Sequence, residues 1–318
     1  MLFVTMETPC TPPSNYKGEK TLNNGYSSPF VMPQTPCMTK LGFGTGMSVY
    51  HLHRSPRFGN ERSPWAIKKR NVRAQRRIYV DKLYKEAKIL CSLDHPNIVG
   101  FRGFMITPDG REVLLMEECT QSLGDYIENF SQDCGAFSPT TIYQVIASVS
   151  SALQYLHEDQ ELIHGDIKSF NILIKGKLEF IKLCDFGVSL NIGEDGISDE
   201  EYVGTLPWTA PEALEDGLIT EKVDIFAFGL TIYEMLALKL PHWEFDDTYL
   251  MDSTFESDML DDSIEKPYGT RPELPSLGSE YKDIVALFNW CTEEDYIKRP
   301  RARDMLNTLH NKHLNKQF

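Results

Sequence analysis

The sequence predicts an α+β protein with two lobes, a small β-rich lobe followed by a larger and mainly helical lobe. Two observations lead to this prediction. Residues 40–117 contain short apolar segments of strand length, interrupted by one segment with helical spacing. After Cys119, apolar residues recur at helical spacing, as at Ile142, Val145 and Ile146.

The small lobe is expected to begin with a turn, because glycine occurs repeatedly at its start. The expected elements, in chain order, are a glycine-rich turn at Leu41–Gly46, strands at Met47–Leu52 and Trp65–Lys69, a helix over Val80–Leu93, and strands at Val99–Ile106 and Glu112–Glu117. Proline at position 96 cannot continue a helix, which explains why the helical pattern stops there.

The large lobe is expected to be built from four long helices. They are predicted, from the spacing of apolar residues, over Ile142–Leu156, Lys222–Leu238, Tyr281–Cys291 and Ala302–His310. The first of them leads directly toward the loop at His164.

Composition divides the chain into a tail and one domain. Residues 1–36 are rich in Pro, Thr, Ser and Asn and lack apolar periodicity, so we expect a disordered regulatory tail. The domain is expected over 37–315, with the small lobe at 37–117 and the large lobe at 119–315. Residues 244–265 are acidic and lack Lys and Arg, which favours a solvated acidic insert.

Charge and composition exclude several classes of function. The chain has 318 residues and a net charge of −14, which would repel a nucleic-acid backbone, so no nucleic-acid partner is expected. No apolar run is long enough to span a membrane, and Met1–Cys10 does not resemble a secretory signal. We therefore expect an intracellular protein of the cytoplasm and/or nucleus, without a membrane partner. Seven cysteines without a CxxC pair also disfavour a structural zinc site.

One short stretch concentrates the residues that carry chemistry. It is His164-Gly165-Asp166-Ile167-Lys168-Ser169-Phe170-Asn171, and Asp185-Phe186-Gly187 follows it after a strand pattern. The stretch supplies a carboxylate base, a lysine, and two side chains that can bind a metal ion. Such a combination is typical of phosphoryl transfer.

Four other motifs accompany this stretch. They are Leu41-Gly42-Phe43-Gly44-Thr45-Gly46-Met47-Ser48-Val49, Trp65-Ala66-Ile67-Lys68, Gly204-Thr205-Leu206-Pro207-Trp208-Thr209-Ala210-Pro211-Glu212, and Asp224-Ile225-Phe226-Ala227-Phe228-Gly229. Each motif alone is weak, but their order and spacing together are specific. From roughly Lys40 to His310 the chain resembles the eukaryotic protein kinases, and the resemblance implies the two-lobed protein kinase fold.

The resemblance implies a role for each residue of the central stretch. Asp166 would accept the proton of the substrate hydroxyl, and Lys168 would neutralise charge on the transferring phosphate of ATP. Asn171 and Asp185 would hold Mg²⁺, so ATP and Mg²⁺ are the expected cofactors.

It also implies a nucleotide-binding set in the small lobe. Lys68 would bind the α- and β-phosphates and would be held by Glu86. Lys69 competes for this role, but strand alternation places Lys68 on the same face as Ala66, which also belongs to the implied nucleotide-binding set. The remaining residues of the set are the glycine-rich loop and its flanks (Leu41, Gly42, Gly44, Gly46 and Val49), the gatekeeper Met116, and the hinge from Glu117 to Cys119. Gly46 lies one position earlier than the third glycine of the family pattern.

Three further residues would shape the large lobe. Glu212 would form a structural ion pair with Arg299, and Asp224 would brace the backbone of the catalytic loop. Thr205 would take part in substrate docking, and together with Lys168 it is a feature of Ser/Thr kinases. We therefore expect phosphorylation of Ser or Thr in protein substrates, with dual specificity as the remaining alternative.

Five features narrow the resemblance: the segments His164–Ser169, Gly42–Gly46, Ser63–Lys68 and Ile225–Thr231, and an acidic insert after Pro241-His242. With these features the chain resembles the family of the T-LAK cell-originated kinase, also called PDZ-binding kinase, which is similar to MAP kinase kinases. The resemblance implies mitotic or MAP-kinase-type signalling, with MAP-kinase-type substrates. It also implies a proline-directed upstream kinase that acts on the tail at Thr8-Pro9. The last residues, Asn315-Lys316-Gln317-Phe318, lack the Ser or Thr expected two positions before the end, which weakens the expectation of a PDZ partner.

Gly165 departs from the kinase pattern, because most protein kinases carry an arginine there. That arginine normally pairs with a phosphate on the activation loop. We hypothesise that activity depends less on such a phosphate, with the acidic stretch Asp195–Glu201 partly replacing it. The alternative is a catalytically weak scaffold that uses the kinase fold, the acidic insert and the tail to bind partners.

Overall fold

The structure is a computed structural model, and it describes residues 40–44, 46–52, 64–71, 77–131, 136–242 and 267–315. The predictions for the tail at 1–36, for Thr8 and for the acidic insert at 244–265 lie outside these ranges. The described residues form two compact units. The first contains the residues up to Asp94 together with Gly100–Glu118, and the second contains His95–Val99 and the residues from Cys119 onward.

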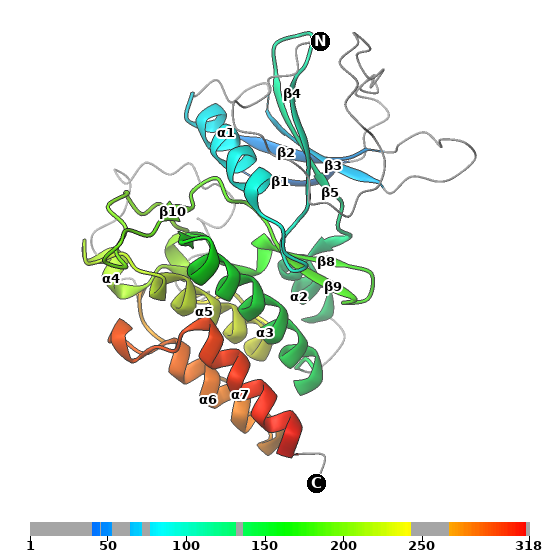
Figure 1. The fold of residues 1–318 in the computed structure, drawn as a ribbon. Helices are drawn as coiled ribbons and strands as arrows, with labels where there is room; N and C mark the ends of the chain where they lie inside the picture. Colours follow the sequence, from blue (N-terminus) through cyan, green and yellow to red (C-terminus); the bar gives the residue numbers. More distant parts are fainter. Residues whose placement is uncertain are drawn as a thin grey trace. The chain divides into compact units, whose positions relative to one another are not determined.

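The first unit is an antiparallel sheet with one helix, drawn in blue, cyan and blue-green in Figure 1. Its strands are β1 (Lys40–Gly44), β2 (Met47–Leu52), β3 (Trp65–Arg70), β4 (Phe101–Ile106) and β5 (Glu112–Glu117), in the spatial order β1-β2-β3-β5-β4. Strands β2 and β3 pair with Val49 opposite Lys68, and β3 and β5 pair with Ala66 opposite Met116. The register therefore sets side by side four residues that the sequence assigns to nucleotide binding.

Helix α1 (Arg77–Ser92) covers this sheet with one buried face. The face consists of Leu83, Glu86, Ala87 and Leu90, whose spacing of three or four residues matches the turn of a helix. Glu86 is the one charged residue of the buried face, and a buried carboxylate requires a partner. The helix thus directs one carboxylate into the interior of the first unit.

The predicted turn at Leu41–Gly46 is wrong in part. Residues Lys40–Gly44 form a strand that pairs with β2, and the chain turns only at Gly46, where φ is +74°. Glycine disfavours strands in isolation, but pairing along a whole neighbouring strand outweighs that preference. The predicted helix at Val80–Leu93 also begins three residues earlier, at Arg77.

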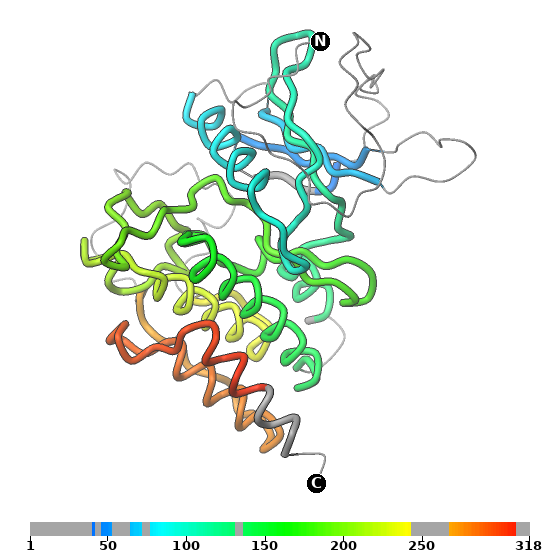
Figure 2. The backbone as a smooth tube through the Cα atoms, in the orientation of Figure 1, coloured from blue at the N-terminus to red at the C-terminus, as the bar shows by residue number. Residues whose placement is uncertain are grey.

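The second unit is mainly helical. Its helices are α2 (Leu123–Ser131), α3 (Pro139–Gln154), α4 (Pro211–Leu214), α5 (Lys222–Ala237), α6 (Lys282–Cys291) and α7 (Ala302–Asn315). Helix α3 runs alongside α7, and α5 packs against α6, as the backbone trace in Figure 2 shows. These contacts bury the apolar stripes that the sequence predicts.

Helix α3 has well-defined ends that position the residues after it. Ser138 caps its first turn by accepting a hydrogen bond from the backbone N–H of Thr141, and Pro139 occupies the first helical position. A π-helical turn, Tyr155–Asp159, follows the last residue of α3. This turn carries His157 toward the centre of the unit.

Helix α5 is the centre of the second unit, because every residue from Lys222 to Leu236 is buried. A helix that is covered on all sides is typical of the middle of a large domain. Its interior includes two carboxylates, Asp224 and Glu234, which are each 1% exposed. Both need partners in other segments, so α5 becomes the point to which those segments are attached.

Short strands connect the helices and carry the functional loops. Strands β6 (Gln121–Ser122), β8 (Ile172–Lys175) and β9 (Phe180–Leu183) form one small sheet. Strands β7 (Leu162–Ile163) and β10 (Leu190–Asn191) form another. None of the described helices has the length and the apolar composition that a membrane span requires.

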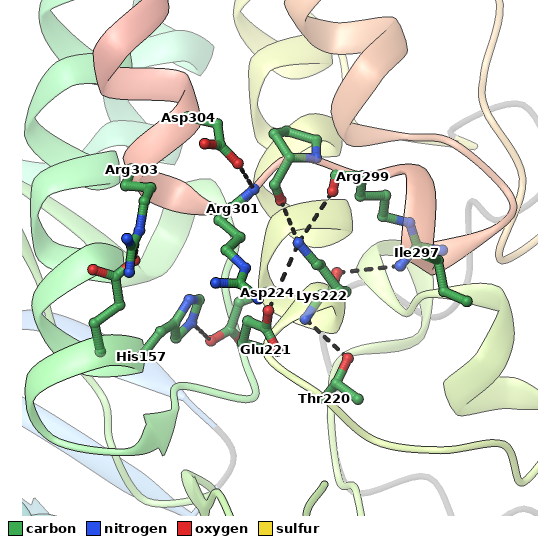
Figure 3. A network of polar contacts seen from close by, with 12 residues as sticks. His157, Thr220, Glu221, Lys222, Asp224, Ile297, Arg299, Arg301, Arg303 and Asp304 are labelled. Carbon is green, nitrogen blue, oxygen red and sulfur yellow. Dashed lines mark hydrogen bonds and ion pairs between the residues drawn. The ribbon is translucent and has the colours of Figure 1, made fainter. Parts of the chain in front are cut away.

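A buried ion pair ties the C-terminal part of the unit to α4. The guanidinium of Arg299 donates to both carboxylate oxygens of Glu212, at 2.6 and 2.8 Å. The Arg299 side chain is fully buried, and its ring neighbour Phe226 lies 4.7 Å from the guanidinium carbon. Figure 3 shows the adjoining contacts, in which the ammonium of Lys222 donates to the carbonyls of Arg299 and Pro300.

We predict that Glu212→Ala lowers the free energy of unfolding by about 3–5 kcal/mol, because it leaves a buried guanidinium without its carboxylate. Chemical denaturation measures the loss. The matched control is Glu293→Ala, since Glu293 pairs with Arg271 at 3.4 Å and is 40% exposed. This control should cost less than about 1 kcal/mol. Equal losses for the two variants would contradict the prediction.

Candidate active site

The predicted catalytic loop lies between two short strands, β7 and β8, of the second unit. It leaves β7 at His164, passes Asp166 and Lys168, forms a 3₁₀ turn at Ser169–Asn171, and enters β8. The β8–β9 hairpin then returns the chain to Cys184, whose N–H donates to the carbonyl of Asn171. The hairpin thus brings Asp185, the residue after Cys184, beside the loop that ends at Asn171.

The side chain of Asp224, on helix α5, binds the backbone at the start of this loop. Its carboxylate accepts hydrogen bonds from the backbone N–H of His164 at 2.7 Å and of Gly165 at 2.9 Å. His157 adds a third contact, with Nε2 at 2.9 Å from Oδ2, and Figure 3 shows the two side chains facing each other. Burial would raise the pKa of the Asp224 carboxyl, but His157, His164 and the backbone hydrogen bond from Gly165 together outweigh burial and hold the pKa below its ordinary value.

His164 takes a defined tautomer in this arrangement. Its Nε2 faces the carbonyl oxygen of Cys184 at 3.0 Å, so this nitrogen must carry the proton. Its Nδ1 accepts from the N–H of Asp166 at 3.3 Å. The ring also packs against Phe186, which is fully buried, with the ring centroids 4.8 Å apart. His164 therefore links the loop to the segment that carries Asp185.

Three polar groups converge on Asp166. The hydroxyl of Thr205 donates to Oδ1 at 2.6 Å, and the ammonium of Lys168 lies 2.9 Å from Oδ2. Lys168 also donates to the same Thr205 hydroxyl at 2.7 Å. Asn171 Nδ2 donates to Oδ2 at 2.8 Å and to the Asp166 carbonyl at 2.7 Å. A carboxylate, an ammonium and an aliphatic hydroxyl thus share one hydrogen-bonded cluster.

The donor set near this cluster fits a hard divalent cation. The amide nitrogen of Asn171 is used by Asp166, so its amide oxygen is the atom left to face a metal. Asp185 adds a carboxylate and has a left-handed backbone, with φ of +67°. Mg²⁺ is usually held by one or two such oxygens together with substrate phosphates. The described residues contain no group of three or more His, Cys, Asp or Glu arranged as metal ligands.

The first unit contains a second charged pair. Lys68 on β3 lies 2.8 Å from Glu86 on α1, and both side chains are at least nine-tenths buried. Ala66, two residues earlier on β3, is also buried. Lys69 is buried as well, but its ammonium lies 4.4 Å from the ring centroid of Tyr50. Lys68 is therefore the lysine that the helix glutamate holds.

The remaining predicted nucleotide-binding residues of the first unit lie on its strands. Val49 is on β2, Leu41, Gly42 and Gly44 are on β1, and Gly46 forms the turn between these strands. Met116 and Glu117 end β5, and Glu117 is fixed by its N–H, which donates to the carbonyl of Gly100. Cys119 begins the second unit and is buried.

The activation segment, which we take as the residues from Asp185 to Glu212, has several contacts that do not involve Gly165. Strand β10 pairs with β7, and the carboxylate of Glu200 accepts from the backbone N–H and the side-chain amide of Asn191 at 2.9 and 2.7 Å. Farther along, the N–H of Ser198 donates to the carbonyl of Ile219 at 2.8 Å. Glu200, which accepts these hydrogen bonds from Asn191, belongs to the acidic stretch Asp195–Glu201 that we expect to replace a phosphate in part.

Gly165 has a backbone conformation that favours glycine. Its φ is +81°, and a Cβ placed on it would lie 3.0 Å from the carbonyl oxygen of Val188. An arginine here would therefore meet both an unfavourable backbone angle and a close contact with backbone. The loop of this chain thus has a local conformation that suits the glycine it carries.

Sequence reasoning missed two buried residues at this site, His157 and Glu234. His157 follows a regular apolar helix, and a histidine there gives no signal by itself. Glu234 could have been noticed, because a glutamate within the apolar sequence that forms α5 indicates a buried carboxyl that needs a partner. Its contacts with Ser169 and Trp208 join the catalytic loop to the segment after Thr205.

Comparison with known proteins agrees with this geometry. A family model described as "Protein kinase domain" matches residues 37–310. The chain therefore belongs to the protein kinase family. This confirms the α+β kinase fold and the protein kinase activity that the motifs predict. ATP with a divalent metal ion is the cofactor combination that this family uses, and proteins are its substrates.

A full-length relative refines the assignment. The chain is 44% identical over 317 residues to the human "Lymphokine-activated killer T-cell-originated protein kinase", covering 93% of this chain and 98% of that protein. The expected resemblance to this kinase group is thus confirmed. The chain is also 35% identical to "Cytokinesis protein sepH" of Emericella nidulans and 31% identical to "MAP3K epsilon protein kinase 1" of Brassica napus. These matches cover 70% and 72% of this chain but only 15% and 16% of those proteins.

We predict that Gly165→Arg does not raise phosphotransfer activity and lowers the free energy of unfolding by about 1–2 kcal/mol or more, because it forces a left-handed conformation on a side chain that contacts Val188. Urea denaturation and an activity assay measure the two effects. Gly196→Ala is the matched control, since Gly196 has φ of +83° and open space around it. Gly165→Ala should lose more stability than Gly196→Ala, and an activated, fully stable Gly165→Arg would refute the account.

Proposed function

We propose that this protein kinase transfers the γ-phosphate of ATP to serine and threonine hydroxyls of protein substrates. The supporting observation is the cluster around Asp166. There a threonine hydroxyl already donates to the carboxylate while it accepts from the ammonium of Lys168. The same two contacts suit an incoming aliphatic hydroxyl that must lose its proton as it attacks phosphorus.

Asp166 acts as the base in this proposal. The acceptor hydroxyl passes its proton to a carboxylate oxygen of Asp166 as its oxygen forms the new bond to phosphorus, and the bond from phosphorus to ADP breaks. Asn171 restrains the carboxylate through Oδ2, which leaves Oδ1 directed at the hydroxyl. Lys168 stabilises negative charge on the transferring phosphoryl group.

Asn171 and Asp185 would hold Mg²⁺, because an amide oxygen and a carboxylate oxygen are ligands that this cation accepts. When bound, Mg²⁺ neutralises charge on the phosphates and orients them. Lys68 would bind the α- and β-phosphates, and its ion pair with Glu86 would keep the ammonium in place. The glycine-rich strands and turn at Gly42–Gly46 would let backbone approach the phosphates closely.

The preference for serine and threonine over tyrosine rests on Lys168 and Thr205. Their short contact places the docking segment close to the base, which suits a short aliphatic side chain. Dual specificity is the alternative, and phosphoamino-acid analysis of the products distinguishes the two.

The relatives named for cytokinesis and as a MAP3K support a place in mitotic or MAP-kinase-type signalling. We further propose that a proline-directed kinase regulates the protein at Thr8.

We predict that the wild-type protein with ATP and Mg²⁺ phosphorylates serine and threonine peptides, and that Asp166→Asn loses about 100-fold or more of kcat, since a positioned base contributes 10²–10⁴-fold. Radiolabelled phosphate transfer followed by phosphoamino-acid analysis measures this. Asn keeps the size of the side chain, and thermal unfolding checks that the variant is folded. Equal incorporation by both proteins would support the scaffold alternative, and phosphotyrosine among the products would establish dual specificity.

A further inference from the structure

The turn between β1 and β2 lies against an aromatic ring of helix α1. Gly46 forms this turn with φ of +74°, and a Cβ added to it would lie 2.7, 2.8 and 2.8 Å from the Cζ, Cε1 and Cε2 atoms of Tyr79. Cβ atoms in proteins do not approach other atoms so closely, so the ring occupies the space that a side chain at position 46 would need. Glycine suits this turn through the contact as well as through the backbone angle.

The same turn is also bound to the residue that follows β3. The backbone N–H of Asn71 donates to the carbonyl of Gly46 at 2.8 Å. The Asn71 side chain accepts from the hydroxyl of Ser48 at 2.5 Å and donates to the carbonyl of Met47 at 3.4 Å. These hydrogen bonds hold the turn to the sheet, and the ring of Tyr79 links it to the helix.

Tyr79 shares a side of α1 with the glutamate that holds Lys68. It precedes the buried residue Leu83 by one helical turn and Glu86 by two, so all three side chains project from the same side of the helix. Glu86 lies 2.8 Å from Lys68 on β3. One side of α1 thus contacts both parts of the first unit that we propose for the phosphates of ATP, which are the lysine and the glycine-rich turn.

We propose that Tyr79 is a positioning residue for ATP, whose ring holds the turn at Gly46 in a fixed place relative to the Lys68–Glu86 pair. A tyrosine ring is rigid and has few rotatable bonds, so it can fix a turn that has no side chain of its own. A turn that is held before ATP arrives loses less conformational freedom on binding, which favours binding. The inference rests on the proposed function for its kinetic consequence, but the order of the turn is a property of the protein without ATP.

The kinetic test compares a variant that removes the ring with one that keeps it. For Tyr79→Leu we expect the KM for ATP to rise about three- to tenfold, which is the range for the loss of one aromatic contact. Its kcat should stay within about twofold of wild type, because the Asp166 cluster is not altered. Tyr79→Phe keeps all three contacting ring atoms, so its KM should stay within about twofold of wild type.

A second tyrosine of the same helix provides the matched control. The ring of Tyr84 packs against Phe104 of β4, with the ring centroids 4.8 Å apart. Tyr84→Leu therefore removes an aromatic contact between α1 and the sheet. It should lower thermal stability and leave the KM for ATP within about twofold of wild type.

A double-mutant cycle tests the contact itself. In Gly46→Ala the added Cβ would displace the ring of Tyr79. Adding Tyr79→Leu to Gly46→Ala should then raise the KM for ATP less than about twofold further, because the contact is already lost. Additive effects of the two substitutions would show that the ring does not act through the turn, and would overturn the inference.

Amide hydrogen exchange without ATP gives the structural readout. The N–H of Asn71, which donates to the carbonyl of Gly46, reports on the turn. The N–H of Glu117 reports on the opposite end of β3, where Glu117 pairs with the first residue of that strand. We expect the Asn71 amide to exchange faster in Tyr79→Leu than in wild type or in the two control variants, and the Glu117 amide to exchange as in wild type.

Two results would each overturn the inference. One is an unchanged KM for ATP in Tyr79→Leu, and the other is unchanged exchange of the Asn71 amide in that variant. A wild-type protein that transfers no phosphate above Asp166→Asn would instead overturn the proposed function. In that case the exchange of Asn71 would still decide whether the ring holds the turn.

Discussion

One buried carboxylate, that of Asp224, binds the backbone at the start of the predicted catalytic loop. Asp224 accepts hydrogen bonds from two consecutive backbone N–H groups, those of His164 and Gly165, and a third contact comes from His157. Two adjacent amides can point at one acceptor only if the backbone turns sharply between them, and Gly165 has φ of +81° at that turn. The arrangement directs the chain so that Asp166 follows in a fixed position.

Other buried polar side chains at or near helix α5 attach further segments of the second unit in the same way. The first turn of α5 carries Asp224, which binds the backbone of the predicted catalytic loop, and its fourth turn carries Glu234, which contacts that loop and Trp208. At its start, Lys222 and the Arg299–Glu212 pair attach the segment before α7. A helix that is covered on all sides moves little, so the groups attached to it share a rigid reference.

Residues that share one local motif could be predicted from the sequence, whereas those joined by tertiary contacts could not. Asp166, Lys168 and Asn171 lie within six positions, so their order alone was enough to predict phosphoryl transfer at this loop. Lys68 could be preferred over Lys69 from strand alternation. The contact between Glu234 and Ser169 spans 65 positions, and no local pattern encodes it. The strand at Lys40–Gly44 was missed because its stability comes from pairing rather than from its glycine-rich sequence.

The central claim is that the Asp224 carboxylate sets the catalytic loop, and Asp224→Asn tests it most directly. The amide keeps the size of the side chain but presents an NH₂ group to one of the two backbone N–H groups. The account predicts a fall in kcat of about tenfold or more, together with faster hydrogen exchange at the His164 or Gly165 amide. A folded Asp224→Asn protein with wild-type kcat and wild-type exchange at both amides would contradict it.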